Sequence, residues 1–312
     1  MIGIVSTSGD LHALAIMREF ERRNRRDCKL LAIDKIWNQQ SIFVDLSTVG
    51  ISEFRSNGNA LRIADLEVIW WRRPFARQVT PKTIQKTQQR FIDEQCRAAY
   101  WGALVSAFKG KWVSMPEATL RASNKILQLR VARSVGFRVP DTIVSQSRAE
   151  VLTFWESCSG EVIVKSLVAI ESPFLLTRRL DDPRLFEEEA YLACPAIYQE
   201  LIPGRRHMRL SCFGDRAFAA VIESEDLDWR PKLDVPVYCY DVPRDLLDRA
   251  RLVLNLLGLE MGIFDLKETP QGEWVWLEVN PQGQFLFLEP ITRVALAENF
   301  ADFLIQCANR EA

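Results

Sequence analysis

The stretch Gly262 to Phe285, GIFDLKETPQGEWVWLEVNPQGQF, carries the strongest pattern in the chain. Two short apolar runs flank a Pro-Gln-Gly turn, which predicts a pair of antiparallel strands. Asp265 lies inside the first run, and Glu278 and Asn280 close the second. Because alternate residues of a strand share a face, Glu278 and Asn280 are expected to point the same way.

All three side chains carry oxygen atoms on what the sequence predicts to be an interior sheet. Buried carboxylates are costly without a cation, and Mg²⁺ prefers a few protein oxygens together with phosphate oxygens and water. The pattern therefore predicts that Asp265, Glu278 and Asn280 bind a magnesium ion that bridges nucleotide phosphates. The alternative is a hairpin whose polar groups lie on its wet side.

Composition indicates a large, folded and nearly neutral chain. Its 312 residues are 48% hydrophobic, and 40 Lys and Arg balance 41 Asp and Glu, for a net charge of -1. This balance argues against nucleic-acid and membrane partners, and no stretch approaches the ~20 apolar residues of a membrane-spanning helix. Scattered cysteines without a CxxC pair fit a reducing cytoplasm rather than disulfides or zinc.

The pattern of elements changes along the chain. Strands are expected over 1–6, 29–33 and 66–71, and helices over 12–25 and 81–110, which predicts a small parallel α/β domain. A helix is expected over 122–135, with Ser123 as its N-cap and Gly136 at its end. Short strands joined by tight turns then predict an antiparallel α+β region, closed by a helix over 294–308. The predicted fold class is α/β plus α+β.

Two lysines and one strand are candidates for a nucleotide site. Lys165 ends the strand EVIVK, and Lys125 lies near the start of a helix, so both ammonium groups can reach phosphates. Each lysine taken alone is also compatible with a solvated charge. The run QELI over 199–202 turns at Pro203-Gly204, so its backbone can meet an adenine and Glu200 can accept from a ribose or base donor. An ordinary strand end is the alternative.

Three basic motifs are candidates for binding an anionic substrate. Arg209 follows a basic run into a strand, and its guanidinium suits a transferring phosphate or a carboxylate; a solvated loop is the alternative. WWRRP closes a strand of the first domain, where α/β proteins place ligand groups. Arg72 and Arg73 are expected to meet an acidic substrate, unless a rigid loop stacks on the indoles. A β-turn with a stacked arginine explains the third motif, DWRP over 228–231, equally well.

Taken in order, these motifs resemble the ATP-grasp superfamily over nearly the whole chain. WWRRP, NKILQLRVARSVGFRVPDT and FDLKETPQGEWVWLEVNPQGQF more narrowly resemble the graspetide, or microviridin-type, ATP-grasp peptide maturases. The resemblance implies an ATP-grasp fold with an N-terminal α/β pre-ATP-grasp domain. The implied boundaries are 1–115 for that domain, 116–196 for a central subdomain and 197–312 for a C-terminal subdomain.

The resemblance also implies an activity, that of an ADP-forming ligase using ATP and Mg²⁺. It would activate Asp or Glu side chains of a precursor peptide as acyl phosphates, which Ser, Thr or Lys of the same peptide capture as ester or amide links. The alternatives are an intermolecular carboxylate–amine ligase and a nucleotide-binding module without catalysis. The expected partner is the peptide, with no nucleic acid or membrane, and a homodimer is compatible with the resemblance.

The roles that the resemblance implies fall on the motifs above. Catalysis is assigned to Arg209 and Lys165, and metal binding to Asp265, Glu278 and Asn280. ATP is assigned to Lys125, Lys165, Gln199, Glu200, Leu201, Ile202 and Arg209. The acidic substrate is assigned to Arg72, Arg73, Arg206, His207 and Arg230. Two departures stand out: the loop SLVAIESP after Lys165 contains no glycine, and His207 replaces an acidic residue that often precedes the strand arginine by two.

Overall fold

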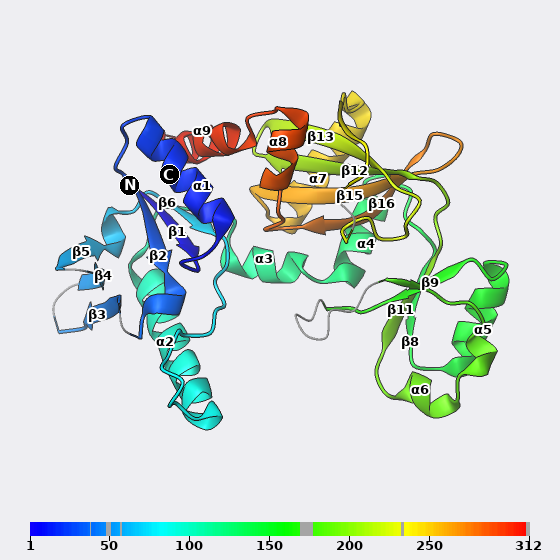
Figure 1. The fold of residues 1–312 in the computed structure, drawn as a ribbon, viewed down its shortest axis with the longest axis horizontal. Helices are drawn as coiled ribbons and strands as arrows, with labels where there is room; N and C mark the ends of the chain where they lie inside the picture. The colour runs from blue at the N-terminus through cyan, green and yellow to red at the C-terminus, as the bar shows by residue number, and fades with distance from the viewer. Residues whose placement is uncertain (38, 48–50, 57, 169–176, 232–233, 310–312) are drawn as a thin grey trace. The chain divides into compact units, whose positions relative to one another are not determined.

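The chain folds into two compact units in the computed structural model, which describes all residues except 38, 48–50, 57, 169–176, 232–233 and 310–312. Met1–Glu117 and Gln282–Ala312 form the first unit, and Ala118–Pro281 forms the second (Figure 1). The sequence assigns residues 282–312 to a C-terminal ATP-grasp subdomain, whereas they pack within the first unit. The boundaries at 115/116 and 196/197 stay predictions.

The first unit is built on a parallel sheet. Its strands, in the order β2-β1-β6-β7, are β2 (Cys28–Ala32), β1 (Ile2–Ser6), β6 (Val68–Trp71) and β7 (Lys111–Val113). Its long helices are α1 (Leu11–Arg22), α2 (Lys86–Ala107) and α9 (Leu296–Asn309). Every residue of β1 and β6 is buried, which is why these strands form near-continuous apolar runs. Arg23, just after α1, donates to Asp302 of α9 at 2.5 Å, so the end of the chain packs beside its beginning.

A small antiparallel sheet in the first unit was not predicted from the sequence. It contains β3 (Ser41–Asp45), β4 (Ile51–Ser56) and β5 (Asn59–Arg62), in that order. These strands are short and mostly half-buried or exposed, and their only apolar run is the three residues 42–44 of β3, which is too brief to predict a strand on its own. Single turns of 3-10 helix over Ile33–Lys35, Ile63–Asp65 and Leu286–Leu288 and the short helix α8 (Glu289–Thr292) complete the unit.

The second unit contains two antiparallel sheets. The smaller, in the order β10-β9-β11-β8, contains β10 (Arg178–Arg179), β9 (Val162–Lys165), β11 (Ala196–Glu200) and β8 (Thr142–Ser145). The larger, in the order β14-β13-β12-β15-β16, contains β14 (Val237–Tyr240), β13 (Arg216–Glu223), β12 (Arg206–Phe213), β15 (Met261–Glu268) and β16 (Trp274–Asn280). The helices are α3 (Pro116–Ala122), which begins in the first unit, α4 (Lys125–Ser134), α5 (Arg148–Ser157), α6 (Glu188–Leu192) and α7 (Arg244–Leu257), with a 3-10 turn over Pro183–Leu185. This composition confirms the predicted α/β plus α+β class.

The core of the second unit lies on one face of the larger sheet. Helices α4 and α7 cover that face and pack against Phe264, Leu266 and Trp276. The opposite face of β15 and β16 is turned toward the smaller sheet, because residues of both sheets line one cavity. The polar residues of the opening stretch can therefore face this cavity rather than the core.

A β-bulge decides which side chains of β16 point there. Asp265 pairs with Glu278 and Leu266 pairs with Trp276, so Leu277 is left without a partner residue on β15. Strict alternation would place Trp276 and Glu278 on one face. The extra residue instead sends Trp276 into the core and turns Glu278 to the cavity, because a bulge shifts the side-chain alternation by one.

The helix predicted over 122–135 is wrong in its first turn. The structure has two helices, and Asn124, rather than Ser123, caps the second by accepting from the backbone N–H of Leu127 at 3.0 Å. Asn and Ser are both good N-caps, so the sequence does not choose between them. The predicted end is confirmed, because Gly136 adopts the positive φ that ends α4.

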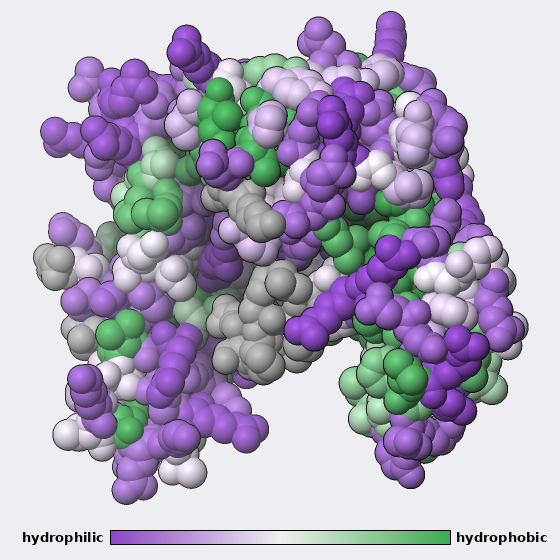
Figure 2. Space-filling model, turned by 45° about the vertical axis from the view of Figure 1, so that its right-hand side comes forward, coloured by the Kyte–Doolittle hydropathy of each residue, from purple (hydrophilic) through white to green (hydrophobic). Residues whose placement is uncertain are grey.

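No helix among the described residues combines the length and hydrophobicity needed to cross a membrane. The face of the molecule drawn in Figure 2 is largely hydrophilic, with its hydrophobic residues in separate patches.

Candidate functional site

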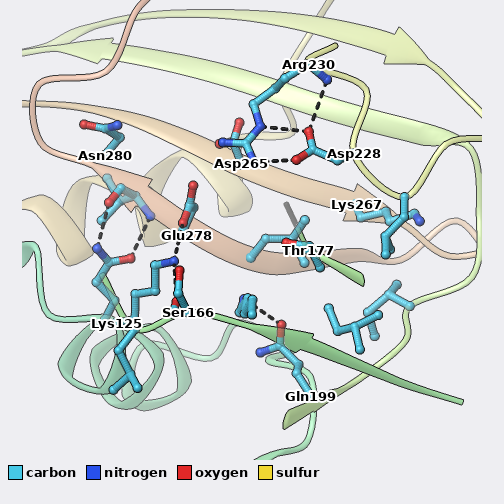
Figure 3. A pocket seen from close by; sticks show the side chains of 18 of the residues that line it. Lys125, Ser166, Thr177, Gln199, Asp228, Arg230, Asp265, Lys267, Glu278 and Asn280 are labelled. Atoms are coloured by element: carbon cyan, nitrogen blue, oxygen red, sulfur yellow. Dashed lines mark hydrogen bonds and ion pairs between the residues drawn. The ribbon is translucent and has the colours of Figure 1, made fainter. Parts of the chain in front are cut away.

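A cavity of about 670 Å³ lies between the two sheets of the second unit (Figure 3). The predicted site residues that line it are Lys125, Lys165, Gln199, Glu200, Leu201, Ile202, His207, Arg230, Asp265, Glu278 and Asn280. Lining residues that were not predicted include Gln128, Ser166, Thr177, Asp228 and Lys267. Arg72, Arg73, Arg206 and Arg209 are not among its lining residues.

The paired carboxylates form one edge of the cavity. Asp265 lies directly across the β15–β16 ladder from Glu278. Both oxygens of Asp265 accept from Arg209 Nη1 at 2.8 Å, so the arginine predicted to hold a phosphate is engaged with a carboxylate. Burial raises the pKa of the Asp265 carboxyl, Arg209 opposes that rise and Glu278 adds to it. The direct phosphate contact of Arg209 stays a prediction.

The oxygen donors at this edge suit a hard cation that brings its own further ligands. Within the described parts of the chain, no group of three or more His, Cys, Asp or Glu side chains is arranged to hold a metal alone. Asp265 and Glu278 supply two carboxylates, and Asn280 supplies an amide beside them. Mg²⁺ is commonly bound through one or two carboxylates plus substrate phosphates, so this set fits the ion together with a nucleotide.

Two lysines approach the carboxylate edge from the other side of the cavity. Lys125 Nζ donates to the backbone oxygen of Ser166 at 3.1 Å and lies 3.9 Å from Glu278. Lys165 Nζ donates to the amide oxygen of Gln199 at 2.8 Å. Burial lowers the pKa of Lys165 to about 8; Glu278 opposes this shift and Lys125 reinforces it. Lys165 has only a neutral amide as its partner, and Lys125 has only a long contact of 3.9 Å with Glu278, so both can neutralise an anionic ligand.

The segment over 199–202, which runs past the end of β11 at Glu200, forms a further part of the lining. Gln199 is fully buried, and its amide nitrogen donates to Thr142 Oγ1 at 2.8 Å while its oxygen holds Lys165. Glu200 accepts from Arg138 at 3.2 Å and from a backbone N–H. Gly204 has a φ of +119°, and an added Cβ would lie 2.1 Å from the backbone oxygen of Glu268. Only glycine allows the chain to turn this close to β15.

The remaining predicted substrate residues of this unit differ in their surroundings. Arg206 is bound by Glu268 and donates to Tyr238 Oη at 3.0 Å, away from the cavity lining. Arg230 lines the cavity and binds Asp228 through Nε at 2.8 Å and Nη2 at 2.5 Å. His207 lines the cavity and is buried, and burial together with Lys267 lowers the pKa of its imidazole to about 4.

Arg72 has an internal role in the first unit. Its fully buried side chain donates to Asp10 at 3.1 Å and to the backbone oxygens of Gln282 and Gly283, and burial lowers its pKa to about 10. The guanidinium thereby fixes residues 282–283, near the end of the opening stretch. Arg73 is exposed. Contact of either arginine with a substrate stays a prediction, and the glycine-poor loop after Lys165 lies largely outside the described residues.

The chain is similar to known proteins in sequence and in structure. No protein-family model matches the chain. The alpha-aminoadipate–LysW ligase LysX of Sulfurisphaera tokodaii is 24% identical over 197 residues, which cover 59% of this chain and 68% of LysX.

Solved structures match the chain over nearly their whole length, and two of them illustrate the similarity. One is macrocyclase MdnC of Microcystis aeruginosa MRC bound to its precursor peptide MdnA, with a TM-score of 0.87, 23% identity, and coverage of 98% of this chain and 99% of that one. The other is a RiPP-associated ATP-grasp ligase of Chryseobacterium gregarium in complex with ADP and a leader and core peptide. It has a TM-score of 0.88, 20% identity, and coverage of 100% of this chain and 99% of that one. The chain therefore has the ATP-grasp fold that its sequence motifs predict.

Proposed function

We propose that this chain is an ADP-forming ligase that activates Asp or Glu side chains of a ribosomal precursor peptide as acyl phosphates. A Ser or Thr hydroxyl, or a Lys amine, of the same peptide then closes an ester or amide link. One observation carries the proposal: in an ATP-grasp fold, the cavity presents Lys125 and Lys165 opposite Asp265 and Glu278. That arrangement suits a nucleotide triphosphate held between cations and metal-binding carboxylates.

The chain's own residues would act by positioning and by charge. Lys125 and Lys165 would hold phosphate oxygens, and the segment over 199–202 would meet the adenine. Asp265, Glu278 and Asn280 would hold Mg²⁺, which when bound neutralises negative charge on the phosphates. Arg230, at the cavity wall, would meet the acidic side chain of the peptide. Neutralisation and alignment of this kind account for most of the catalysis of phosphoryl transfer.

The chemistry needs two displacements and no protein nucleophile. An oxygen of the peptide carboxylate forms a bond to the γ-phosphorus of ATP as the bond to ADP breaks. The hydroxyl or amine of the acceptor side chain then bonds to the acyl carbon, inorganic phosphate leaves, and the acceptor's proton passes to solvent. Each link therefore removes the elements of one water from the peptide.

The peptide as substrate is supported by the two structural matches, since MdnC is a macrocyclase bound to a precursor peptide and the Chryseobacterium ligase is bound to leader and core peptides. A cytoplasmic location and the three-part division at 1–115, 116–196 and 197–312 belong to the same proposal. A homodimer is compatible with it.

A second candidate is an intermolecular carboxylate–amine ligase that joins an amino acid to a peptide or a small acid. The observation that favours it is the sequence similarity to LysX, which is named as a ligase of alpha-aminoadipate and LysW. The third alternative, a nucleotide-binding module without catalysis, would bind Mg-ATP in the same cavity.

The test is incubation of the purified chain with Mg-ATP and acidic candidate peptides, followed by mass spectrometry and an ADP assay. The proposal predicts a loss of one water per link, with one ADP released for each. A product heavier than its acid substrate would select the intermolecular ligase. Thermal stabilisation by Mg-ATP without ADP release from any peptide would select the non-catalytic module.

A further inference from the structure

A histidine and a lysine face each other across two strands of the cavity wall. His207 of β12 and Lys267 of β15 are register partners, two residues from the Arg209–Asp265 pair. Alternate residues share a face, so both pairs lie on the same side of the sheet. His207 is 4% and Lys267 is 7% exposed, and both line the cavity.

Each side chain carries a nitrogen that the described part of the protein leaves without a partner, although the imidazole of His207 also hydrogen-bonds with the backbone of Ser224. Among the residues that the structure describes, Lys267 Nζ makes no hydrogen bond or ion pair, and His207 Nε2 is buried without a hydrogen-bond partner. The polar tips of this pair therefore meet the cavity itself, which is wide enough for a ligand.

The two carboxylates that share β15 with Lys267 within two residues of it are each bound to an arginine. Asp265 binds Arg209, and Glu268 binds Arg206. Asp228, whose charge acts on His207, binds Arg230. The carboxylate whose charge acts on Lys267 is Glu225, whose side chain is 86% exposed and lies 3.9 Å from Arg205. The internal charges of this region are thus balanced without Lys267.

A buried ammonium without a counter-ion is unfavourable, and a buried imidazole nitrogen without a partner adds to the cost. Such a cost is relieved when an anion enters. We propose that Lys267 and His207 form an anion subsite of the cavity, in which Lys267 provides an ion pair to an oxygen of a phosphate or a carboxylate and His207 lines the wall beside it. This inference rests on the proposed function only for the identity of the anion.

Two ligand groups have the required chemistry, a phosphate of the nucleotide and an acidic side chain of the peptide. Lys267 lies two residues, or about 7 Å, from Asp265 along β15, and Figure 3 shows it at the opposite end of the cavity from Asn280 and Lys125. It also adjoins Glu268, which Gly204 approaches at the end of the 199–204 segment. A nucleotide with its terminal phosphates at Asp265 and its base at that segment would bring its α-phosphate to Lys267.

The experiment compares Lys267→Met and Lys267→Arg with the wild-type chain and with Lys82→Met, which removes an exposed lysine of the first unit. Isothermal titration with Mg-ADP, AMP and adenosine measures the nucleotide contact, and the KM of a peptide substrate measures the peptide contact. For a phosphate, Lys267→Met is expected to weaken Mg-ADP and AMP roughly ten- to a hundred-fold. Adenosine, Lys267→Arg and Lys82→Met should show much smaller effects.

For a peptide carboxylate, nucleotide affinity would be unchanged and the peptide KM would rise by a similar factor in Lys267→Met alone. Either result supports an anion subsite and identifies its source. Unchanged nucleotide affinity and unchanged peptide KM in a folded Lys267→Met chain would overturn it. So would a melting temperature of the ligand-free variant far below that of the wild type, because removing an unpaired charge should not destabilise the protein.

His207→Gln is a second test of the subsite. The glutamine amide can both donate and accept a hydrogen bond, so the expected loss of affinity for the same ligand is smaller than in Lys267→Met. The titration with Mg-ADP needs no turnover. A wild-type chain that binds Mg-ADP but never consumes ATP would therefore refute the ligase proposal and leave the subsite testable. An active wild-type chain whose Mg-ADP affinity and peptide KM are unchanged by Lys267→Met would refute the subsite alone.

Discussion

Arg72 and Lys165 are both cations at the ends of strands, yet they sit in opposite electrostatic situations. Arg72 is fully buried in the first unit and is matched by Asp10 and by two backbone oxygens. Lys165, in the second unit, has a neutral amide as its partner and another lysine nearby. A cation that is balanced inside the chain stabilises the fold, whereas one that is not balanced is held ready for a ligand.

The largest expected effect is on stability, from Arg72→Met. It leaves Asp10 buried without its arginine, and breaking a buried ion pair on one side costs about 3–5 kcal/mol. Urea unfolding followed by circular dichroism measures the loss. Arg73→Met, at the exposed neighbour, is the matched control and should change the free energy of unfolding by less than about 0.5 kcal/mol. If both substitutions changed the free energy of unfolding by an equally small amount, Arg72 would not be a stabilising cation, and the contrast between Arg72 and Lys165 would be wrong.

Glu278→Gln should reduce the rate of ADP release by about 10²–10³-fold while leaving the fold intact. The change removes a metal-binding carboxylate and the negative charge 3.9 Å from Lys125, and one preorganised charge at a reaction centre has an effect of this size. Steady-state ADP release with a peptide substrate is the measurement. Glu273→Gln, at an exposed position just before the same strand, should retain activity, and an active Glu278→Gln chain would refute the metal assignment.

Lys165→Met should weaken Mg-ADP binding roughly ten- to a hundred-fold, as expected for the loss of a charge-assisted contact. The melting temperature of the ligand-free chain should stay the same or rise, because the substitution removes a half-buried charge that has no carboxylate partner. This is the reverse of the behaviour expected for Arg72→Met. Titration calorimetry measures the affinity for Mg-ADP, and thermal melting measures the stability of the ligand-free chain. A large drop in melting temperature would show that Lys165 stabilises the fold.

The smallest effect expected is a pH dependence of nucleotide binding. The pKa of Lys165 is lowered to about 8, so its ammonium is mostly charged at pH 7 and mostly neutral at pH 9. Phosphates bind the charged form, so affinity for Mg-ADP should fall roughly ten-fold as pH rises between these values. Lys165→Arg, which stays charged, should flatten the profile. If the affinity of Lys165→Arg for Mg-ADP fell with pH as steeply as that of the wild type, the titrating group would be another residue.

The sequence predicted the parallel sheet, the antiparallel region and part of the cavity lining, because those features follow from local patterns. Apolar runs mark the strand that ends at Lys165 and the strand that contains Asp265. The resemblance of the motifs, taken in order, to the ATP-grasp superfamily then indicated that these strands belong to one site. The bulge at Leu277 was beyond such reasoning, since strict alternation puts Trp276 and Glu278 on one face and only the pairing with β15 shows otherwise.

Other features depend on long-range partners that no local pattern reveals. Asp10 and the backbone of residues 282–283 give Arg72 its internal role, although they lie far from it in sequence. Lys267 stands on the same strand face as Asp265 and was visible in the sequence, but its lack of a counter-ion is a property of the folded sheet. The small sheet of the first unit was missed because its strands are short and mostly half-buried or exposed.

The most direct test of the account follows the oxygen atoms of the peptide carboxylate. The peptide is prepared with a heavy oxygen isotope in its Asp and Glu side chains, and the phosphate released during the reaction is analysed by mass spectrometry. An acyl phosphate transfers one labelled oxygen to each phosphate that leaves, so the account predicts labelled phosphate in step with ADP and with ring formation. Ring formation that releases only unlabelled phosphate would contradict it.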